Sequence, residues 1–164
     1  MNKYITLFAL ATLANIECKA QPNVAVPRLV VGITVDQLNS DDMEQFAALY
    51  GNGGFKKLLR EGVVYENAQY DFAPINLASA TTAIATGASP VDNGITAERW
   101  VSRETLRPVG CTFDKKFFVS PNNVKSSTIG DEMKMASNGN ALVFSVAANQ
   151  DAAVLQGGHA ADGV

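Results

Sequence analysis

Apolar and polar positions follow two different spacings along this chain. Nearly continuous runs of β-branched and other apolar residues at 28–36 and 141–147 predict strands buried on both faces of a sheet. Shorter segments at 63–70 and 152–159 predict further strands. Helical spacing prevails between them, and strands that alternate with helices indicate an α/β layer structure with a mostly parallel sheet.

Helix signals separate these strands. Apolar residues recur at helical spacing over 43–50, behind Asp41 or Asp42 as a cap, and over 55–61, where Gly62 is the stop. Another helix is expected over 128–137, where a serine at position 126 or 127 can cap the first turn. The stretch from about 91 to 123 is rich in turn residues and predicts irregular structure.

The stretch "APINLASATTAIATGASP", residues 73–90, is typical of a strand-to-helix turn. Asn76 can cap a helix that ends near Thr86 and Gly87. Backbone N–H groups at the start of such a helix are a ready anion site. The same small residues are also what close packing of a helix on a sheet requires, so both interpretations stay open.

Asp36 is the last residue of the first predicted strand. In an open α/β sheet, ligands bind outside the carboxyl ends of the strands, and a carboxylate there can hold a metal ion. It can equally cap the following helix. A metal on Asp36 beside the start of the 76–86 helix would make a phosphate-handling site.

The first twenty residues have the anatomy of a secretory signal, with a basic residue, a short apolar run and a polar end that predicts cleavage before Gln21. The run is too short to span a bilayer, and Glu17 directly before Cys18 argues against a lipid anchor. We assign residues 1–20 to a signal peptide and 21–27 to an extended leader. The protein is expected to be exported, to the periplasm or cell envelope, without a transmembrane segment.

Composition narrows the function classes. In 164 residues, 47% hydrophobic and 18% charged content is ordinary for a soluble domain. The formal charge is −3 and no basic run exceeds two residues, so we expect no nucleic-acid partner. Cleavage of the signal leaves Cys111 alone, which excludes an internal disulfide and indicates a small buried apolar residue. The oligomeric state cannot be inferred from the sequence.

Four motifs in order resemble the alkaline phosphatase superfamily: "RLVVGITVDQL", "GGFKKLLREGVVYENAQYDFAP", "TGASPVDNGI" and "VLQGGHAADG". The similarity runs over residues 28–163 and is strongest to the exported bacterial branch of type I phosphodiesterases/nucleotide pyrophosphatases and phosphate-irrepressible phosphatases. It implies a three-layer α/β sandwich with a mostly parallel sheet, alkaline phosphatase-like and incomplete in this chain. Residues 28–164 would form the N-terminal portion of that domain.

The resemblance also implies a chemistry, the metal-dependent hydrolysis of phosphate mono- or diesters. Two zinc ions would be held by Asp and His residues, and a Thr or Ser at the start of the second helix would form a covalent phospho-enzyme. Asp36 matches the family's first metal aspartate. The other ligands would follow the Gly-Gly-His motif, so this sequence alone cannot build a two-zinc site. His159, the single histidine, is interpreted as a structural residue of a Gly-rich turn.

Four positions depart from the family pattern in a way that affects the phosphate pocket. Leu77 stands at the nucleophile position by two independent alignments. Glu98 replaces an Asn, and Asn149 and Asp151 replace a Lys and an Arg. A phosphate pocket would therefore lose its attacking hydroxyl and two cations, and it would gain carboxylates that repel the substrate.

Nearby hydroxyls are not expected to replace the nucleophile. Ser79 points about 200° away around the helix from the first position, and Thr81 lies roughly 6 Å further along the axis. Asn76, Leu77 and Glu98 would line the substrate pocket. We therefore expect a divergent, catalytically impaired hydrolase. Two alternatives remain: an exported pseudoenzyme that binds a phosphate-ester ligand or a partner at the old cleft, and a truncated fragment without independent function.

Overall fold

The computed structural model describes residues 27–164. By its internal contacts the chain divides into residues 1–30 and 31–164, and every helix and strand described below belongs to the second unit. The predicted signal peptide, and the leader apart from residue 27, lie outside the described residues. Within residues 27–164, no helix combines the length and apolar character needed to cross a membrane.

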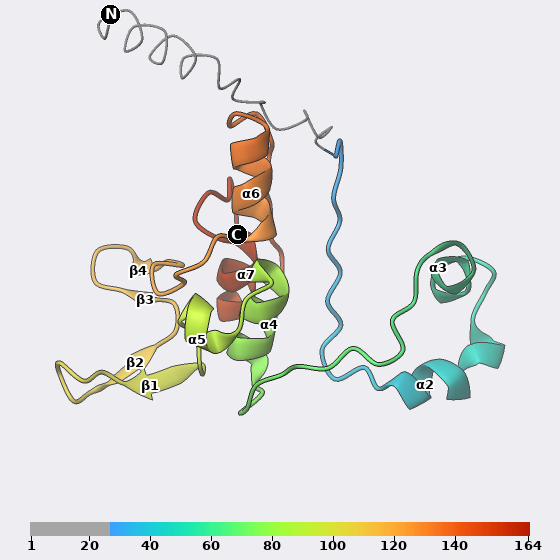
Figure 1. The fold of residues 1–164 in the computed structure, drawn as a ribbon, viewed down its shortest axis with the longest axis horizontal. Helices are drawn as coiled ribbons and strands as arrows, with labels where there is room; N and C mark the ends of the chain where they lie inside the picture. The colour runs from blue at the N-terminus through green and yellow to red at the C-terminus, as the bar shows by residue number, and fades with distance from the viewer. Residues whose placement is uncertain (1–26) are drawn as a thin grey trace, which may run out of the picture. The chain divides into compact units, whose positions relative to one another are not determined.

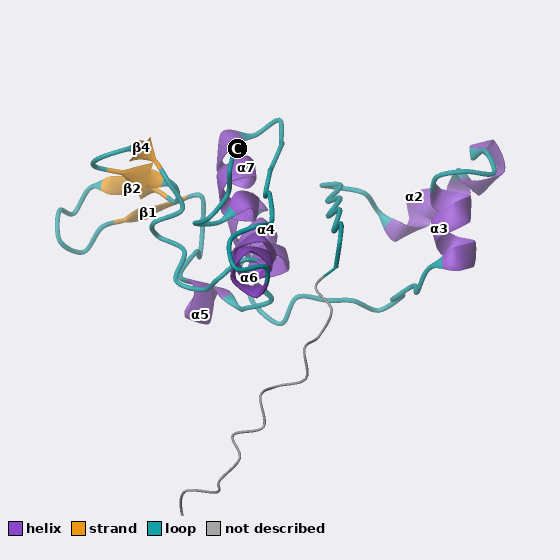
Figure 2. Cartoon of the chain, turned by 90° about the horizontal axis from the view of Figure 1, so that it is seen from above, coloured by secondary structure: helices purple, strands orange, loops and turns teal. Residues whose placement is uncertain are grey.

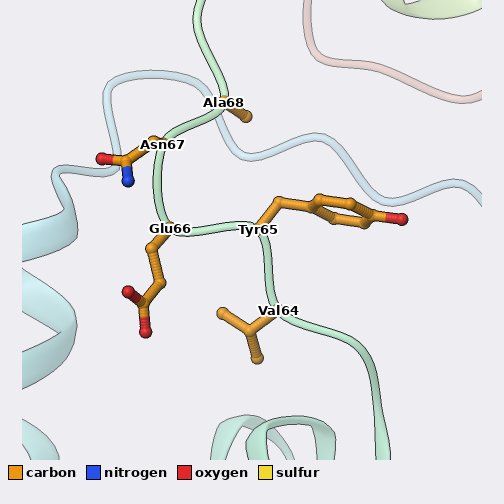
Figure 3. Close-up of a pocket in the computed structure, with 5 residues that line it drawn as sticks. All are labelled: Val64, Tyr65, Glu66, Asn67 and Ala68. Atoms are coloured by element: carbon orange, nitrogen blue, oxygen red, sulfur yellow. The ribbon is translucent and has the colours of Figure 1, made fainter.

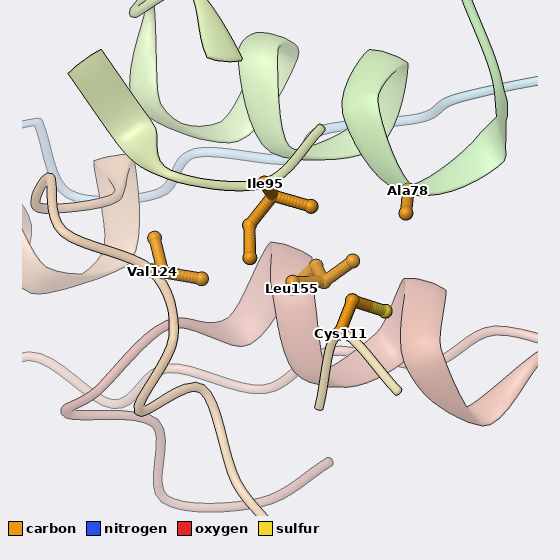
Figure 4. Close-up of a cluster of buried hydrophobic side chains, with 5 residues drawn as sticks. All are labelled: Ala78, Ile95, Cys111, Val124 and Leu155. Carbon is orange, nitrogen blue, oxygen red and sulfur yellow. The ribbon is translucent and has the colours of Figure 1, made fainter. Parts of the chain in front are cut away.

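Helices α4 (Leu77–Thr86) and α7 (Gln150–Gly157) pack against each other and hold the core (Figure 1). Both helices bury alanines, and these small side chains allow the two backbones to approach closely. Trp100, the single tryptophan, packs against the edge of the core cluster. The buried apolar side chains of this cluster (Figure 4) are Ala78, Ile95, Cys111, Val124 and Leu155.

Local capping explains where α4 begins and ends. Asn76 Oδ1 accepts a hydrogen bond from the N–H of Ser79 at 3.0 Å, and Ser79 Oγ accepts one from the N–H of Asn76 at 3.0 Å. This reciprocal pair is a capping box. Gly87, at φ 65°, ends the helix in the left-handed region. Both ends agree with the sequence prediction. The short helix α5 (Pro90–Asn93) follows.

Helix α6 (Ile129–Ala136) is capped by Thr128 and not by the serine at position 126 or 127. Thr128 Oγ1 accepts from the N–H of Asp131 at 3.2 Å, and Asp131 Oδ2 accepts from the N–H of Thr128 at 2.9 Å. A capping box needs a polar side chain three residues after the cap. Only Thr128 has one there, because the residues three beyond the two serines are Ile129 and Gly130.

The prediction of a strand over 152–159 is wrong, because most of this segment belongs to helix α7. Asn149 caps α7, its Oδ1 accepting from the N–H of Ala152 at 3.1 Å. A short apolar run has no periodicity that separates a strand from a buried helix. The cap before the run and the packing against α4 decide the outcome.

Two antiparallel hairpins occupy the stretch that was expected to be irregular. Strand β1 (Arg99–Val101) pairs with β2 (Pro108–Gly110), with Arg99 opposite Gly110. Strand β3 (Phe113–Asp114) pairs with β4 (Phe118–Val119), with Phe113 opposite Val119. Both hairpins lie on the same side of α4 and α7 in two perpendicular views (Figures 1 and 2).

Helices form near the predicted positions in the first part of the chain. Helix α2 (Ser40–Gln45) is followed by a 3₁₀ turn (Ala47–Leu49), and α3 is Phe55–Glu61. The cap of α2 is Asn39, which lies before the two aspartates predicted for that role. Gly62 follows α3, as expected.

The predicted strands, in contrast to these helices, do not form ladders with one another in the described part of the chain. Segments 28–36 and 63–70 have no ladder partner among the described residues, and 141–147 makes a single parallel bridge between Phe144 and Gly163. A strand is stabilised by the N–H and C=O groups of its neighbours. Without neighbours the apolar side chains stay in solvent, and Ile33 is 80% exposed. The mostly parallel sheet is therefore not assembled within residues 27–164.

Candidate functional site

The start of α4 is where the resemblance places the phosphate pocket. Leu77 is the first residue of the helix and is half-buried. Asn76, its cap, donates from Nδ2 to the carbonyl oxygen of Thr96 at 3.0 Å. This bond fixes the segment before β1 against the start of α4, so two of the predicted pocket residues lie beside the segment that carries the third, Glu98.

The hydroxyl-bearing residues that follow Leu77 are buried, and two of their hydroxyls are hydrogen-bonded to backbone carbonyl oxygens. Ser79 is fully buried, and its Oγ lies 3.2 Å from the carbonyl oxygen of Asn76 and 3.4 Å from that of Pro74. Thr82 is also fully buried and donates to the carbonyl oxygen of Ala78 at 2.8 Å. Thr81 is 3% exposed. A hydroxyl that attacks a phosphorus atom must approach within about 3–3.5 Å, and these side chains are not presented to a ligand.

Glu98 reaches the same region through its backbone. Glu98 directly precedes β1 and Cys111 directly follows β2. The carbonyl oxygen of Glu98 accepts a hydrogen bond from the N–H of Cys111 at 2.8 Å. The Glu98 side chain itself is exposed. The carboxylate therefore stands at the surface, on the segment whose Thr96 carbonyl Asn76 holds at the start of α4.

Asp151 lies in the first turn of α7 and is tied to the neighbouring loop. Thr112 Oγ1 donates a hydrogen bond to Asp151 Oδ1. Burial, and then the Asp151 carboxylate, raise the pKa of the Cys111 thiol to about 12. Cys111 is consequently a neutral, fully buried thiol and no nucleophile. Asn149, the other position where the resemblance implies a cation, serves as the cap of α7.

Asp36 is not connected to the residues at the start of α4. It is exposed, in a turn that follows the 28–35 segment, and no hydrogen bond or ion pair joins it to α4. Within residues 27–164, no three His, Cys, Asp or Glu side chains come together as a metal-binding group. The described residues therefore do not fit a two-zinc site.

His159 holds three parts of the chain together. Its Nδ1 lies 3.2 Å from Asp131 Oδ2 on α6, and its Nε2 lies 3.0 Å from the carbonyl oxygen of Val124. The N–H of Ala160 donates to Asp131 Oδ1 at 2.8 Å. We call this set of contacts the His159 clip. Both ring nitrogens are engaged within the chain, which agrees with the structural role expected for His159.

Asp131 gives the His159 clip a pH dependence. Burial acts to raise the pKa of this carboxyl, but hydrogen bonds from the N–H groups of Thr128 and Ala160 and from His159 outweigh it and lower the pKa. A carboxyl with a lowered pKa stabilises the fold above its ordinary value of about 3.8–3.9, and this contribution is lost as the pH falls through the folded-state value. We expect the free energy of unfolding to decrease below about pH 4.

The measurement is urea denaturation at several pH values between about 2.5 and 6, for the wild type and for Asp131→Asn. The variant carries no titrating group at this position, so its stability should depend less steeply on pH in the acid range. An identical pH dependence in both proteins would contradict the assignment.

A shallow pocket also lies on the loop after α3 (Figure 3). All of its lining residues are consecutive in the chain, so no second element encloses it, and it does not include any predicted site residue. The lining residues are Val64, Tyr65, Glu66, Asn67 and Ala68.

Comparison with known proteins places these observations in a family. The sequence pattern of the family described as "Type I phosphodiesterase / nucleotide pyrophosphatase" matches residues 30–159. Alkaline phosphatase PhoV of Synechococcus elongatus is 38% identical over 162 residues, which cover 90% of this chain and 30% of that protein. Alkaline phosphatase PafA of Elizabethkingia meningoseptica is 36% identical over 153 residues, covering 85% of this chain and 28% of that protein.

The structural comparison agrees with the sequence comparison. The crystal structure of wild-type PafA matches with a TM-score of 0.80 at 33% identity, covering 85% of this chain and 29% of that chain. The present chain thus spans about 30% of the length of these relatives, and its structure is part of an alkaline phosphatase-like α/β fold, as the resemblance predicts. The chain belongs to the type I phosphodiesterase/nucleotide pyrophosphatase family, within the alkaline phosphatase superfamily.

Proposed function

We propose that this chain is a divergent member of a family of metal-dependent phosphate mono- and diester hydrolases, and that its catalytic step is impaired. The observation that carries the proposal is Leu77, the first residue of α4, at the position where the family resemblance puts the hydroxyl nucleophile. A leucine side chain cannot attack phosphorus. The family relationship itself rests on the match over residues 30–159.

Two further observations support the impairment. Ser79, the nearest hydroxyl, is fully buried and used in the capping box of α4. Asp151, which stands where the resemblance expects an arginine, points its carboxylate at Thr112 and has no cation beside it within 4 Å among the described residues. A carboxylate in this place repels a phosphate group and does not bind it.

We also expect, from the family resemblance and the sequence, that the metal is zinc and that the protein is exported. Zinc would be the family's metal, with Asp36 as the single matched ligand, although the described residues do not make a metal site. The signal-like first twenty residues support export to the periplasm or cell envelope. A phosphate ester would be the ligand class, and nucleic acid would not be a partner.

A non-catalytic binding role is the second candidate. The start of α4 is well ordered by local contacts, since α4 is capped at both ends and the Thr96 carbonyl is held by Asn76. The residues at Leu77, Glu98 and Asp151 nevertheless depart from the family pattern that the resemblance implies. An exported pseudoenzyme that binds a ligand or partner there would show this combination.

The test is an assay of the full chain with p-nitrophenyl phosphate and bis(p-nitrophenyl) phosphate, with and without added zinc. We expect no turnover above background for the wild type, and none for Leu77→Thr, because Asp151 would still repel the substrate. Turnover that survives Leu77→Ala but is lost in Ser79→Ala would show a relocated nucleophile and overturn the proposal. Calorimetric binding of inorganic phosphate without turnover would favour the pseudoenzyme.

A further inference from the structure

The ends of the two hairpins share an unusual combination of features. Phe118 is 77% exposed and has φ 66°, and Leu106 is 79% exposed and has φ 53°. A bulky side chain in the left-handed region is a backbone outlier. Outliers of this kind persist where the surrounding structure enforces them, and they often mark functional surfaces. Here each outlier presents an apolar side chain to solvent.

Basic residues lie close to both apolar residues in the sequence. Lys115 and Lys116 precede Phe118, and both are exposed. Neither lysine forms an ion pair within the described part of the chain. Lys116 Nζ lies 4.8 Å from the ring centre of Phe117, which is itself 62% exposed.

The β1–β2 hairpin repeats this pattern. Arg103 and Arg107 flank Leu106, and both are exposed. We call the exposed basic and apolar residues at the two hairpin ends the basic-apolar tips. Their members are Arg103, Leu106, Arg107, Lys115, Lys116, Phe117 and Phe118.

The β3–β4 tip is held in one conformation by its own acidic residue. Asp114 Oδ1 accepts hydrogen bonds from the N–H groups of Lys116 at 2.7 Å and Phe117 at 2.9 Å. Asp114 Oδ2 accepts from Ser120 Oγ at 3.0 Å. The carboxylate therefore faces the turn backbone, while the lysines and phenylalanines remain in solvent. A preformed tip loses little conformational freedom when it binds.

Independently of the proposed function, we propose that the basic-apolar tips dock on an anionic lipid surface. The apolar side chains enter the interface and the lysines and arginines lie against the headgroups. The charge of the tips is opposite to that of such a surface, although the whole chain carries −3. Binding of this kind scales with buried apolar area and with electrostatic attraction to anionic lipid.

The composition of the tips favours lipid over nucleic acid. Single-stranded nucleic acids bind through a basic groove and aromatic stacking. Leu106 offers no stacking face, and the β1–β2 hairpin also carries two exposed acidic residues, Glu98 directly before β1 and Glu104 in the loop. Each hairpin tip offers an exposed apolar side chain with basic residues next to it in the sequence. A lipid interface can bind two such separate side chains without a groove between them.

The experiment is flotation of the full chain with vesicles of phosphatidylcholine, with and without one third phosphatidylglycerol. We expect binding to the anionic vesicles only, weakening as salt rises from 0.1 to 0.5 M. Lys115→Gln combined with Lys116→Gln should weaken binding roughly 30-fold, or about fivefold per lysine. Lys56→Gln combined with Lys57→Gln on α3 makes the same charge change elsewhere and should have little effect.

Phe118→Asn separates binding from folding. Asparagine adopts the left-handed region readily, so this variant should be at least as stable as the wild type in urea. It should nevertheless bind anionic vesicles about tenfold more weakly, because an apolar ring is lost. Equal binding to neutral vesicles, or an equal loss in the α3 variant, would overturn the proposal. So would tighter binding of a single-stranded oligonucleotide that depends on the same lysines.

Discussion

Replacing Gly158 with alanine is expected to lower the free energy of unfolding by at least about 3 kcal/mol. Gly158 follows α7 with φ 78° and ψ −163°, a region that is essentially open to glycine alone. A Cβ there would lie 2.1 Å from Thr128 Oγ1 and 2.7 Å from Asp131 Oδ2. The methyl group would therefore disrupt both the cap of α6 and the His159 clip. Urea denaturation followed by Trp100 fluorescence measures the loss.

Gly139→Ala is the matched control. Gly139 has a similar φ of 82°, but a Cβ there would meet no atom within 4 Å. Its replacement should cost only the backbone penalty, about 1–2 kcal/mol. If both alanine variants lose the same stability, crowding against Thr128 is not the cause and the prediction fails.

Truncation of Leu155 is expected to have the other large effect, a loss of about 2–5 kcal/mol for Leu155→Ala. Leu155 is fully buried and occupies the middle of the cluster between α4, α7 and the loops (Figure 4). The cluster is small, so few other apolar contacts can compensate for the cavity. Since proteins are stable by only about 5–15 kcal/mol, the loss is a large part of the total.

The comparison variant is Leu142→Ala. Leu142 is 75% exposed, and its truncation should change stability by about 0.5 kcal/mol or less. Urea midpoints and hydrogen exchange of the α4 and α7 amides would report both variants. Faster exchange in α4 and α7 should accompany Leu155→Ala alone. Similar midpoints for the two variants would show that the cluster is not the stabilising core.

The parts of the fold that depend on near neighbours could be predicted from the sequence. The start of α4 at Asn76 and its end at Gly87 follow from side chains within a few residues of each terminus. Helix α7 could not be predicted in the same way, because its apolar run fits a strand equally well. The hydrogen bond between Thr112 and Asp151 joins residues that are 39 positions apart, and no local sequence pattern predicts such a pair.

The predicted site residues also differ in whether their placement depends on near neighbours or on distant parts of the chain. Motif positions predict Asn76, Leu77 and Glu98 as pocket residues, and the structure places Asn76 against the segment that carries Glu98. Asp36 was proposed as a metal ligand at a sheet edge, which depends on strand neighbours. Those neighbours are not found among residues 27–164, so the assignment of Asp36 stays a prediction. The basic-apolar tips were not predicted, because their backbone outliers have no sequence signal.

The packing of α4 on α7 has a consequence for how the chain folds. Their contact joins residues roughly seventy positions apart, with both hairpins and α6 in the intervening loop. The entropy lost in closing a loop grows only with the logarithm of its length, about 0.6 kcal/mol for each doubling. Lengthening the hairpin loops would therefore change equilibrium stability little. Non-local contacts of this kind slow the search for the native state, so we expect the core to form after its local helices and turns.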